Sequence, residues 1–387
     1  MGGYARPMDA ENQAADGAHG EHPAGRETVP PPPEPPGPFP VPAPLAGDDP
    51  ARRARRGLLA WLGVMAVGGL GGLIFHQPEA VALVAIGTLF AAAHAADLDP
   101  AWRPAWGILA LLPPAGGMIL FATLAWTLER GTLGPWARGA GITIAAAGAV
   151  ALALSAWPRA AERLAGRLFP TMAPGFAARL GAQLVIAGVL FGVPAWFAFD
   201  SMKDTLLEDP GLLEKTRLSG GLVGYIALAF GGVGLGVRRD LRQSLTRLGL
   251  GPVAARHIGI IAAGALALFA LNAGGEQIQE RFFPALWKAD HEVTRLIARA
   301  LSPGRIVLIG VTAGIGEEIT LRGGLQPRLG IALTSLLFAA LHVQYSWFGM
   351  LLVFTLGVTL GIIRSRANTT AAIVVHGLYD MLALVTS

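Results

Sequence analysis

The chain has 387 residues, and its composition separates it from ordinary soluble proteins. Hydrophobic residues make up 53% of it and charged residues only 14%, which is about half the share usual in a soluble domain. The formal net charge is +4, and there is no cysteine. The composition predicts an integral membrane protein. The absence of cysteine excludes disulfides, thiolate metal sites and a cysteine nucleophile.

Residues 1–50 differ from the rest of the chain because proline dominates much of them. The run VPPPPEPPGPFPVPAP at 29–44 can form neither a helix nor a central strand, since proline lacks a backbone donor and fixes φ. We expect a disordered cytoplasmic tail. Just before the first apolar run, the chain carries four arginines, Arg52, Arg53, Arg55 and Arg56. They fit the cytoplasmic border of a membrane span, and no nucleic-acid partner is expected because no basic domain follows.

Eleven segments are candidate membrane spans, since a span needs about 20 apolar residues. They are 57–76, 79–97, 105–127, 139–157, 181–199, 219–237, 257–273, 304–323, 330–346, 347–364 and 369–386. With the tail in the cytoplasm, the segments on the inside carry most of the Lys and Arg residues, as the positive-inside rule requires. The acidic loop 200–218 is then external. The fold class predicted is an all-α, polytopic bundle of transmembrane helices with about 11 spans.

The external stretch 286–302, LWKADHEVTRLIARALS, is too polar for a span. Its apolar residues recur at helical spacing, which predicts an amphipathic helix lying at the membrane surface.

Several ionisable residues lie inside the last spans. Glu317 precedes the turn PRLG (327–330) by about a dozen residues, and His342 follows that turn by about a dozen. A helix rises about 1.5 Å per residue, so both lie at a similar depth in the bilayer. His376 and Asp380 lie one helical turn apart in the last span. Ionisable groups are costly at this depth and mark functional sites.

The two adjacent glutamates have different neighbours along the helix. Glu318 and Arg322 have the i, i+4 spacing and the order that favour a helical ion pair. This pairing leaves Glu317 without an evident partner, and a lone carboxylate facing histidines can act as a general base for water. A proton relay in a transporter and a non-proteolytic scaffold are the alternatives. Transporters are often built from two repeats of the same fold. The first half of this chain has no second EExxxR pattern, which does not favour a transporter.

Three motifs carry a family resemblance. EEITLR (317–322) has the form EExxxR, FAALH (338–342) the form FxxxH, and HGLYD (376–380) the form HxxxN/D. In this order and at this spacing they resemble the CPBP family of intramembrane proteases, which includes CAAX proteases and bacteriocin-processing enzymes. The resemblance covers about 305–386.

The resemblance implies an intramembrane endopeptidase and a role for each motif residue. Glu317 would activate water, His342 would help to hold it, and His376 and Asp380 would stabilise the oxyanion. Glu318 would pair with Arg322. Two residues depart from the common pattern: Leu321 stands where an aromatic residue is frequent, and Asp380 stands where Asn is found in prenyl-protein endopeptidases.

The resemblance also suggests cofactors, partners and domains. Two histidines and a carboxylate, His342, His376 and Glu317, could bind zinc; we favour a glutamate-activated water without metal. The expected partners are the lipid bilayer and a membrane-associated or lipidated protein or peptide substrate, in the cell (inner) membrane. We expect N-terminal transmembrane helices at 51–256 and a membrane-embedded protease core at 257–387.

Overall fold

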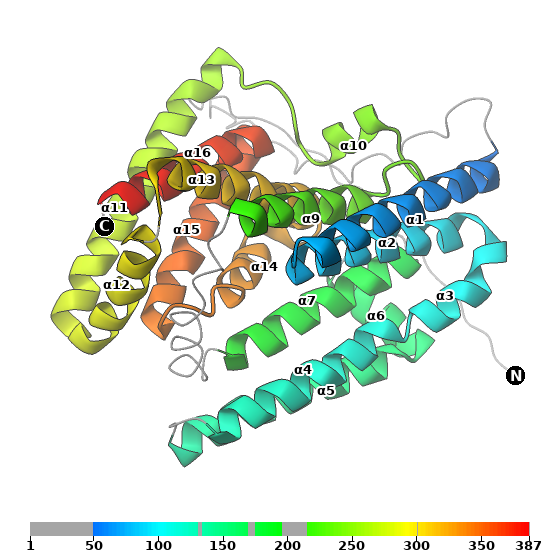
Figure 1. Cartoon of the computed structure of the whole chain (residues 1–387), viewed down its shortest axis with the longest axis horizontal. Helices are drawn as coiled ribbons and strands as arrows, with labels where there is room; N and C mark the ends of the chain where they lie inside the picture. The colour runs from blue at the N-terminus through cyan, green and yellow to red at the C-terminus, as the bar shows by residue number, and fades with distance from the viewer. Residues whose placement is uncertain (1–48, 131–133, 169–174, 196–214, 300, 387) are drawn as a thin grey trace, which may run out of the picture. The chain divides into compact units, whose positions relative to one another are not determined.

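The structure is a computed structural model, and it describes residues 49–130, 134–168, 175–195, 215–299 and 301–386. Within these residues the chain forms helices and no β-strand (Figure 1). Almost all of the predicted tail (1–50) and most of the predicted external loop (200–218) lie outside the described residues, and both stay predictions.

The helices of the first half are α1 (Pro50–Ile74), α2 (Pro78–Leu98), a 3₁₀ turn η1 (Pro100–Trp102), α3 (Arg103–Leu109), α4 (Leu112–Arg130), α5 (Pro135–Ser155), α6 (Pro158–Leu168) and α7 (Phe176–Ala195). The second half contains α9 (Lys215–Val233), α10 (Leu241–Arg247), α11 (Ala255–Phe282), α12 (Pro284–Arg299), α13 (Pro303–Glu317), the π-helix η4 (Glu318–Leu325), α14 (Gln326–Ala340), α15 (Trp347–Arg366) and α16 (Thr369–Thr386).

Each of the eleven predicted spans overlaps a helix of the described residues, and the end of the span predicted at 181–199 lies outside them. In the described part of the chain, eight helical segments are long and apolar enough to cross a membrane. The other three predicted spans correspond to α9, to α13 followed by η4, and to α14, which are not among those eight. The predicted amphipathic helix is α12. The all-α, multi-pass membrane fold is therefore confirmed.

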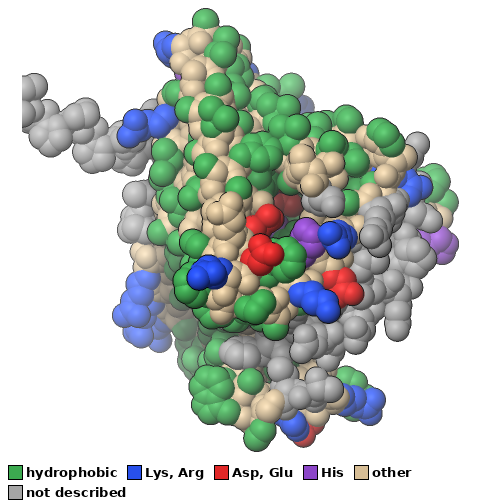
Figure 2. Space-filling view, turned by 90° about the vertical axis from the view of Figure 1, so that its left-hand side faces the viewer, with side chains coloured by type: hydrophobic (Ala, Val, Ile, Leu, Met, Phe, Trp, Pro, Cys, Tyr) green, Lys and Arg blue, Asp and Glu red, His purple; other side chains and the backbone are tan. Residues whose placement is uncertain are grey.

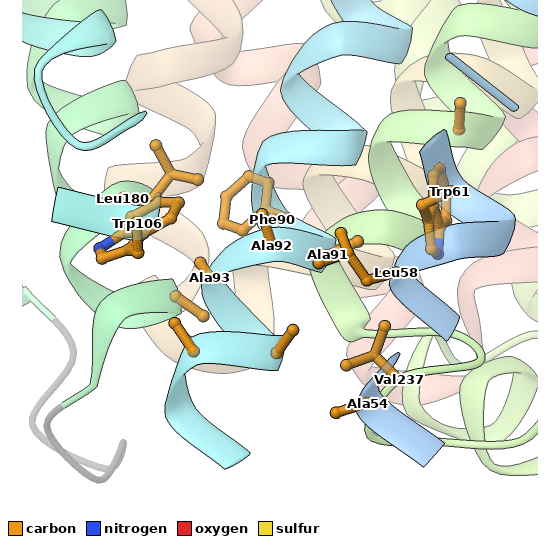
Figure 3. Close-up of a cluster of buried hydrophobic side chains, with 14 of the residues drawn as sticks. Ala54, Leu58, Trp61, Phe90, Ala91, Ala92, Ala93, Trp106, Leu180 and Val237 are labelled. Carbon is orange, nitrogen blue, oxygen red and sulfur yellow. The ribbon is translucent and has the colours of Figure 1, made fainter. Parts of the chain in front are cut away.

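Helix α2 is the most enclosed helix of the first half, packed against α1, α7 and α9. Alanines such as Ala91 and Ala95 are fully buried on it, and Figure 3 shows Leu58 of α1 beside Ala91 within the same hydrophobic cluster. A Cβ atom on Gly87 would lie 2.6 Å from the carbonyl oxygen of Ala227 in α9. Small residues thus let the helix backbones touch, which is how helices associate in a membrane.

Helix α9, the first helix of the second half, packs against helices of both halves. It packs on α13 and η4 as well as on α2. Ala229 and Val233 of α9 share a buried cluster with Leu248 and Ile319 of the second half. The predicted boundary between 51–256 and 257–387 is untested by these contacts and stays a prediction.

Glycines bring α13 and α16 into backbone contact. A Cβ atom on Gly310 would lie 2.7 Å from the carbonyl oxygen of Gly377, and one on Gly314 would lie 3.0 Å from its nitrogen. A glycine pair at i and i+4 is the small-residue pattern that allows close helix crossings in membranes. This contact places the C-terminal end of α13 against the middle of α16.

The close crossing predicts a specific cost for one added methyl group. Gly314→Ala should lower the thermal unfolding midpoint in detergent, because backbone atoms of α16 cannot move aside and overpacking costs about 1–3 kcal/mol. Gly259→Ala in α11 is the matched control, since nothing lies within 4 Å of its added Cβ. That change should be neutral or stabilise by about 0.4–1 kcal/mol. Equal midpoints for the two variants would contradict the close packing.

Candidate active site in the membrane

The first motif begins where the helix type changes. The sequence predicts one continuous α-helix over 304–323, but α13 ends at Glu317 and a π-helix continues to Leu325. Wider π turns occur mostly at functional sites. Arg247 supports this π-helix by donating from Nη1 to the carbonyl oxygen of Gly323 at 3.0 Å and from Nη2 to that of Gly324 at 3.2 Å. Burial, together with neighbouring arginines, lowers the pKa of Arg247 to about 9.

The buried centre of the site is an ion pair between Glu318 and Arg322. Arg322 Nη1 lies 3.5 Å from Glu318 Oε1, and both side chains are fully buried. Arg322 Nη2 also donates to the carbonyl oxygen of Gly357 in α15 at 3.1 Å, and its guanidinium lies 4.4 Å from the ring centre of Phe338. Burial of an ion pair removes water from both charges, which costs free energy. The pair is stabilising only when additional hydrogen bonds and contacts of this kind offset that cost.

The same glutamate also holds a histidine from another helix. His376 Nδ1 lies 3.0 Å from Glu318 Oε1. Because an ionised carboxylate only accepts, Nδ1 is the donor in this bond. His376 Nε2 lies 3.5 Å from Oδ2 of Asp380, one turn further along α16. The sequence analysis paired Glu318 with Arg322 alone; the contact with His376 depends on the crossing of α13 and α16.

Glu317 is placed differently from its neighbour. Its side chain is half-buried, and its Oε2 atom is buried without a hydrogen-bond partner among the described residues. The carboxylate lies near enough to interact electrostatically with His376 and Asp380. Glu318 is thus bound through Oε1 to Arg322 and His376 and has its own unpartnered Oε2 atom, whereas the carboxylate of Glu317 is bound to no arginine or histidine of the described residues.

His342 lies outside the helix in which we expected it. The predicted span 330–346 is wrong at its end, because α14 stops at Ala340. Gly330 has a left-handed φ of 75°, so the regular part of this helix begins only after it. The remaining ten residues rise about 15 Å, which is half of a bilayer core. His342 therefore follows the end of a short helix.

The ring of His342 has a defined orientation. Its Nδ1 lies 2.8 Å from the carbonyl oxygen of Phe338. A carbonyl only accepts, so Nδ1 carries the proton and Nε2 is left to bind another group. Phe338 packs edge-on against both His342 and His376, at 4.5 and 5.9 Å between ring centres. Among the described residues no hydrogen bond joins His342 to Glu317; Phe338 connects the two histidines.

The predicted zinc set does not fit these contacts. Zinc binds through free nitrogen lone pairs and carboxylate oxygens that converge on one point. His376 uses Nδ1 for Glu318 and faces Asp380 with Nε2. No three His, Cys, Asp or Glu side chains of the described residues are grouped to hold a metal ion. The set His342, His376 and Glu317 is therefore not arranged as a zinc site.

Tyrosines beside the acidic groups were missed by the sequence analysis. Tyr225 of α9 packs on Gly316, where a Cβ atom would lie 2.6 Å from its ring, and it interacts electrostatically with Glu317. Tyr345 lies within electrostatic range of Glu317 and Asp380, and Tyr379 within that of Asp380. The chain has only four tyrosines. Their scarcity was a signal; Tyr379 lies within the motif HGLYD and Tyr345 just after FAALH, and only Tyr225 is distant from the motifs along the chain.

These features define a class: a multi-pass helical membrane protein in which Glu318, Arg322 and His376 are buried and Glu317, His342 and Asp380 are half-buried beside them. Residues 299–382 match the family model described as Type II CAAX prenyl endopeptidase Rce1-like. The matched segment contains all three motifs, so the resemblance to CPBP proteases is confirmed. No curated protein and no solved structure matches the chain.

The buried ion pair predicts unequal effects of single and double substitutions. Arg322→Met should lower the free energy of unfolding in detergent by about 3–5 kcal/mol, because Glu318 would stay buried without its cation. The double variant Glu318→Leu, Arg322→Met should recover most of that loss, since it removes both charges. As a control, Arg138→Met removes a partner of Glu129 from an exposed pair and should cost about 0–1 kcal/mol. A double variant no more stable than Arg322→Met would contradict the pairing.

Proposed function

We propose that the chain is an intramembrane endopeptidase in which Glu317 activates the attacking water. The observation that carries this proposal is the unequal environment of the two glutamates. One carboxylate oxygen of Glu318 is held by Arg322 and His376. Each glutamate has a buried Oε2 atom without a hydrogen-bond partner among the described residues, but Glu317 has neither a histidine nor an arginine bound to its carboxylate there. The family match supports peptide-bond hydrolysis as the reaction.

In the proposed mechanism a water molecule lies between Glu317 and the free Nε2 atom of His342. Glu317 takes a proton from this water as the oxygen attacks the carbonyl carbon of the scissile peptide bond. The carbonyl oxygen becomes an oxyanion. When the C–N bond breaks, the proton held by Glu317 passes to the leaving nitrogen. Positioned acid–base groups of this kind contribute about 10²–10⁴-fold in rate.

His376 is proposed to stabilise the oxyanion from α16. Glu318 fixes the ring through Nδ1, so Nε2 is the atom that can face the reaction. Asp380 lies 3.5 Å from Nε2, which is longer than a normal hydrogen bond. We assign Asp380 the orientation of this ring, because an ionised acid directly beside an oxyanion would oppose it.

The site also restricts where the substrate lies. Glu317 and His376 lie on helices that we predict to span the membrane. The scissile bond of the substrate must therefore enter the bilayer to reach them. A membrane-associated or lipidated protein or peptide meets this requirement. We place the chain in the cell (inner) membrane, and the distribution of Lys and Arg supports a tail in the cytoplasm.

Removal of the base tests the proposal. Glu317→Gln keeps the shape of the side chain and should lower cleavage of a membrane-embedded reporter in liposomes by about 10²–10⁴-fold. His342→Ala should lose a comparable factor. The double variant should be little worse than either single variant, because residues that act as a unit are non-additive. Glu276→Gln, on the exposed face of α11, serves as the control with unchanged rate.

Two results would count against this assignment. Cleavage that survives Glu317→Gln would remove the proposed base. Proton-coupled solute uptake by the wild type, lost in Glu317→Gln and without any cleavage, would favour the transporter alternative.

A metal-free mechanism predicts resistance to chelation. After exhaustive treatment with a zinc chelator, the purified protein should cleave the same reporter at its original rate, because in the proposed mechanism Glu317 activates the water without a metal. Metal analysis of the sample before and after treatment checks the removal. Stoichiometric zinc that is lost and regained together with activity would overturn the metal-free mechanism.

A further inference from the structure

A buried carboxylate outside the motifs, Asp290 of α12, holds the start of α15. Its Oδ1 accepts from the backbone N–H of Ser346 at 2.6 Å, and its Oδ2 accepts from the hydroxyl of Ser346 at 2.6 Å. Gln279 of α11 donates to the same Oδ2 at 2.6 Å. These three side chains are 7%, 3% and 2% exposed. Short bonds to an ionised acceptor are among the strong hydrogen bonds of proteins.

The surroundings of Asp290 are shaped for a carboxylate. Ser346 is the N-cap of α15 and accepts from the backbone N–H of Gly349 at 3.3 Å. The carboxylate thus lies at the positive end of a 20-residue helix. A Cβ atom on Gly349 would lie 2.7 Å from Asp290 Oδ2. Only glycine at that position leaves room for this contact.

The segment that Asp290 holds carries His342. The connection from α14 to α15 runs over residues 341–346. Its beginning is fixed to α14 by the bond from the backbone N–H of His342 to the carbonyl oxygen of Ala339 at 2.9 Å. Its end is Ser346. Between them, the backbone N–H of Tyr345 donates to the carbonyl oxygen of His342 at 3.3 Å, and the two rings stack. A displacement of Ser346 is therefore transmitted to the His342 ring.

The anchor comes from the part of the chain before the matched segment. Gln279 and Asp290 both precede residues 299–382. Helix α12 exposes Lys288 and Glu292 and buries Val293. Figure 2 shows charged and histidine side chains interspersed with hydrophobic ones on this side of the molecule, and a hollow with acidic side chains beside it. Such a mixed surface fits a helix at the membrane boundary.

We propose that Asp290 is a positioning residue for the endopeptidase reaction: by binding Ser346 it fixes the 341–346 connection and thereby the position of His342 Nε2. The proposal rests on the proposed function of His342. A misplacement of about 1 Å in a reacting group costs on the order of 10²-fold in rate. The effect of losing Asp290 should thus appear in the chemical step more than in substrate binding.

Hydrogen exchange tests the anchor without any assay of activity. In Asp290→Asn one side-chain oxygen is replaced by a donor that faces the donors of Ser346 and Gln279. Deuterium uptake of a peptide covering 341–350 should become faster in this variant. Asp97→Asn is the matched control, since Asp97 accepts from the backbone N–H of Phe176 at the start of α7 at 2.7 Å. It should leave the 341–350 peptide unchanged. Unchanged uptake in Asp290→Asn would overturn the proposal.

Kinetics test whether the anchor acts through His342. Asp290→Asn should lower kcat by about 10–100-fold with little change in KM. In the His342→Ala background the same substitution should change kcat by less than about twofold. The imidazole whose position Asp290 fixes is already absent in that background, so its displacement can have no effect. An equal loss in both backgrounds would mean a general structural effect and would overturn the proposal. The control Asp97→Asn should lower stability, and any change in kcat should be by the same factor in the wild-type and His342→Ala backgrounds.

A milder variant protects the test against misfolding. Ser346→Ala removes one donor to Asp290 and retains the backbone bond, so it should show the same pattern with a smaller loss of kcat. Full activity of His342→Ala would instead refute the proposed role of His342, and the positioning role with it. That outcome differs from failure of the anchor alone, in which His342→Ala is impaired and Asp290→Asn has no effect on exchange.

Discussion

The arrangement of the site depends on one buried carboxylate, that of Glu318. It is in contact with Arg322 on the same π-helix and with His376 on α16, and its side chain is fully buried. Arg322 in turn binds the carbonyl oxygen of Gly357 in α15. Since a buried charge without its partners costs several kcal/mol, these three helical segments are constrained to one mutual arrangement.

This network can form only because the helices approach closely. In a bilayer the hydrophobic effect does not drive helices together, so packing and polar contacts must do so. Gly310, Gly314 and Gly377 let α13 and α16 touch through their backbones, which brings His376 within hydrogen-bond distance of Glu318. The change to a π-helix at Glu318 gives the carbonyl groups that Arg247 binds.

Helices outside the family segment complete the site. Tyr225 on α9 lies against the backbone next to Glu317, and Asp290 on α12 binds the N-cap of α15 near His342. The first part of the chain is therefore more than an anchor in the membrane. Helices α7, α9, α11 and α12 pack against the segment 299–382. Among them, α9 lies beside the proposed base and α12 binds the connection that carries His342.

The sequence by itself determined the helical membrane class, the positions of the spans and the order of the motifs, because hydropathy and helical spacing are local properties. The spacing of Glu318 and Arg322 also indicated their proximity. Only the tertiary structure decided which groups from different helices meet: His376 with Glu318, Tyr225 with Gly316 and Asp290 with Ser346. It also decided that α14 ends before His342 and that the ring of His376 turns Nδ1 toward Glu318. These features depend on how closely helices pack, on where a short helix stops and on the direction of each ring, none of which is encoded by neighbouring residues alone.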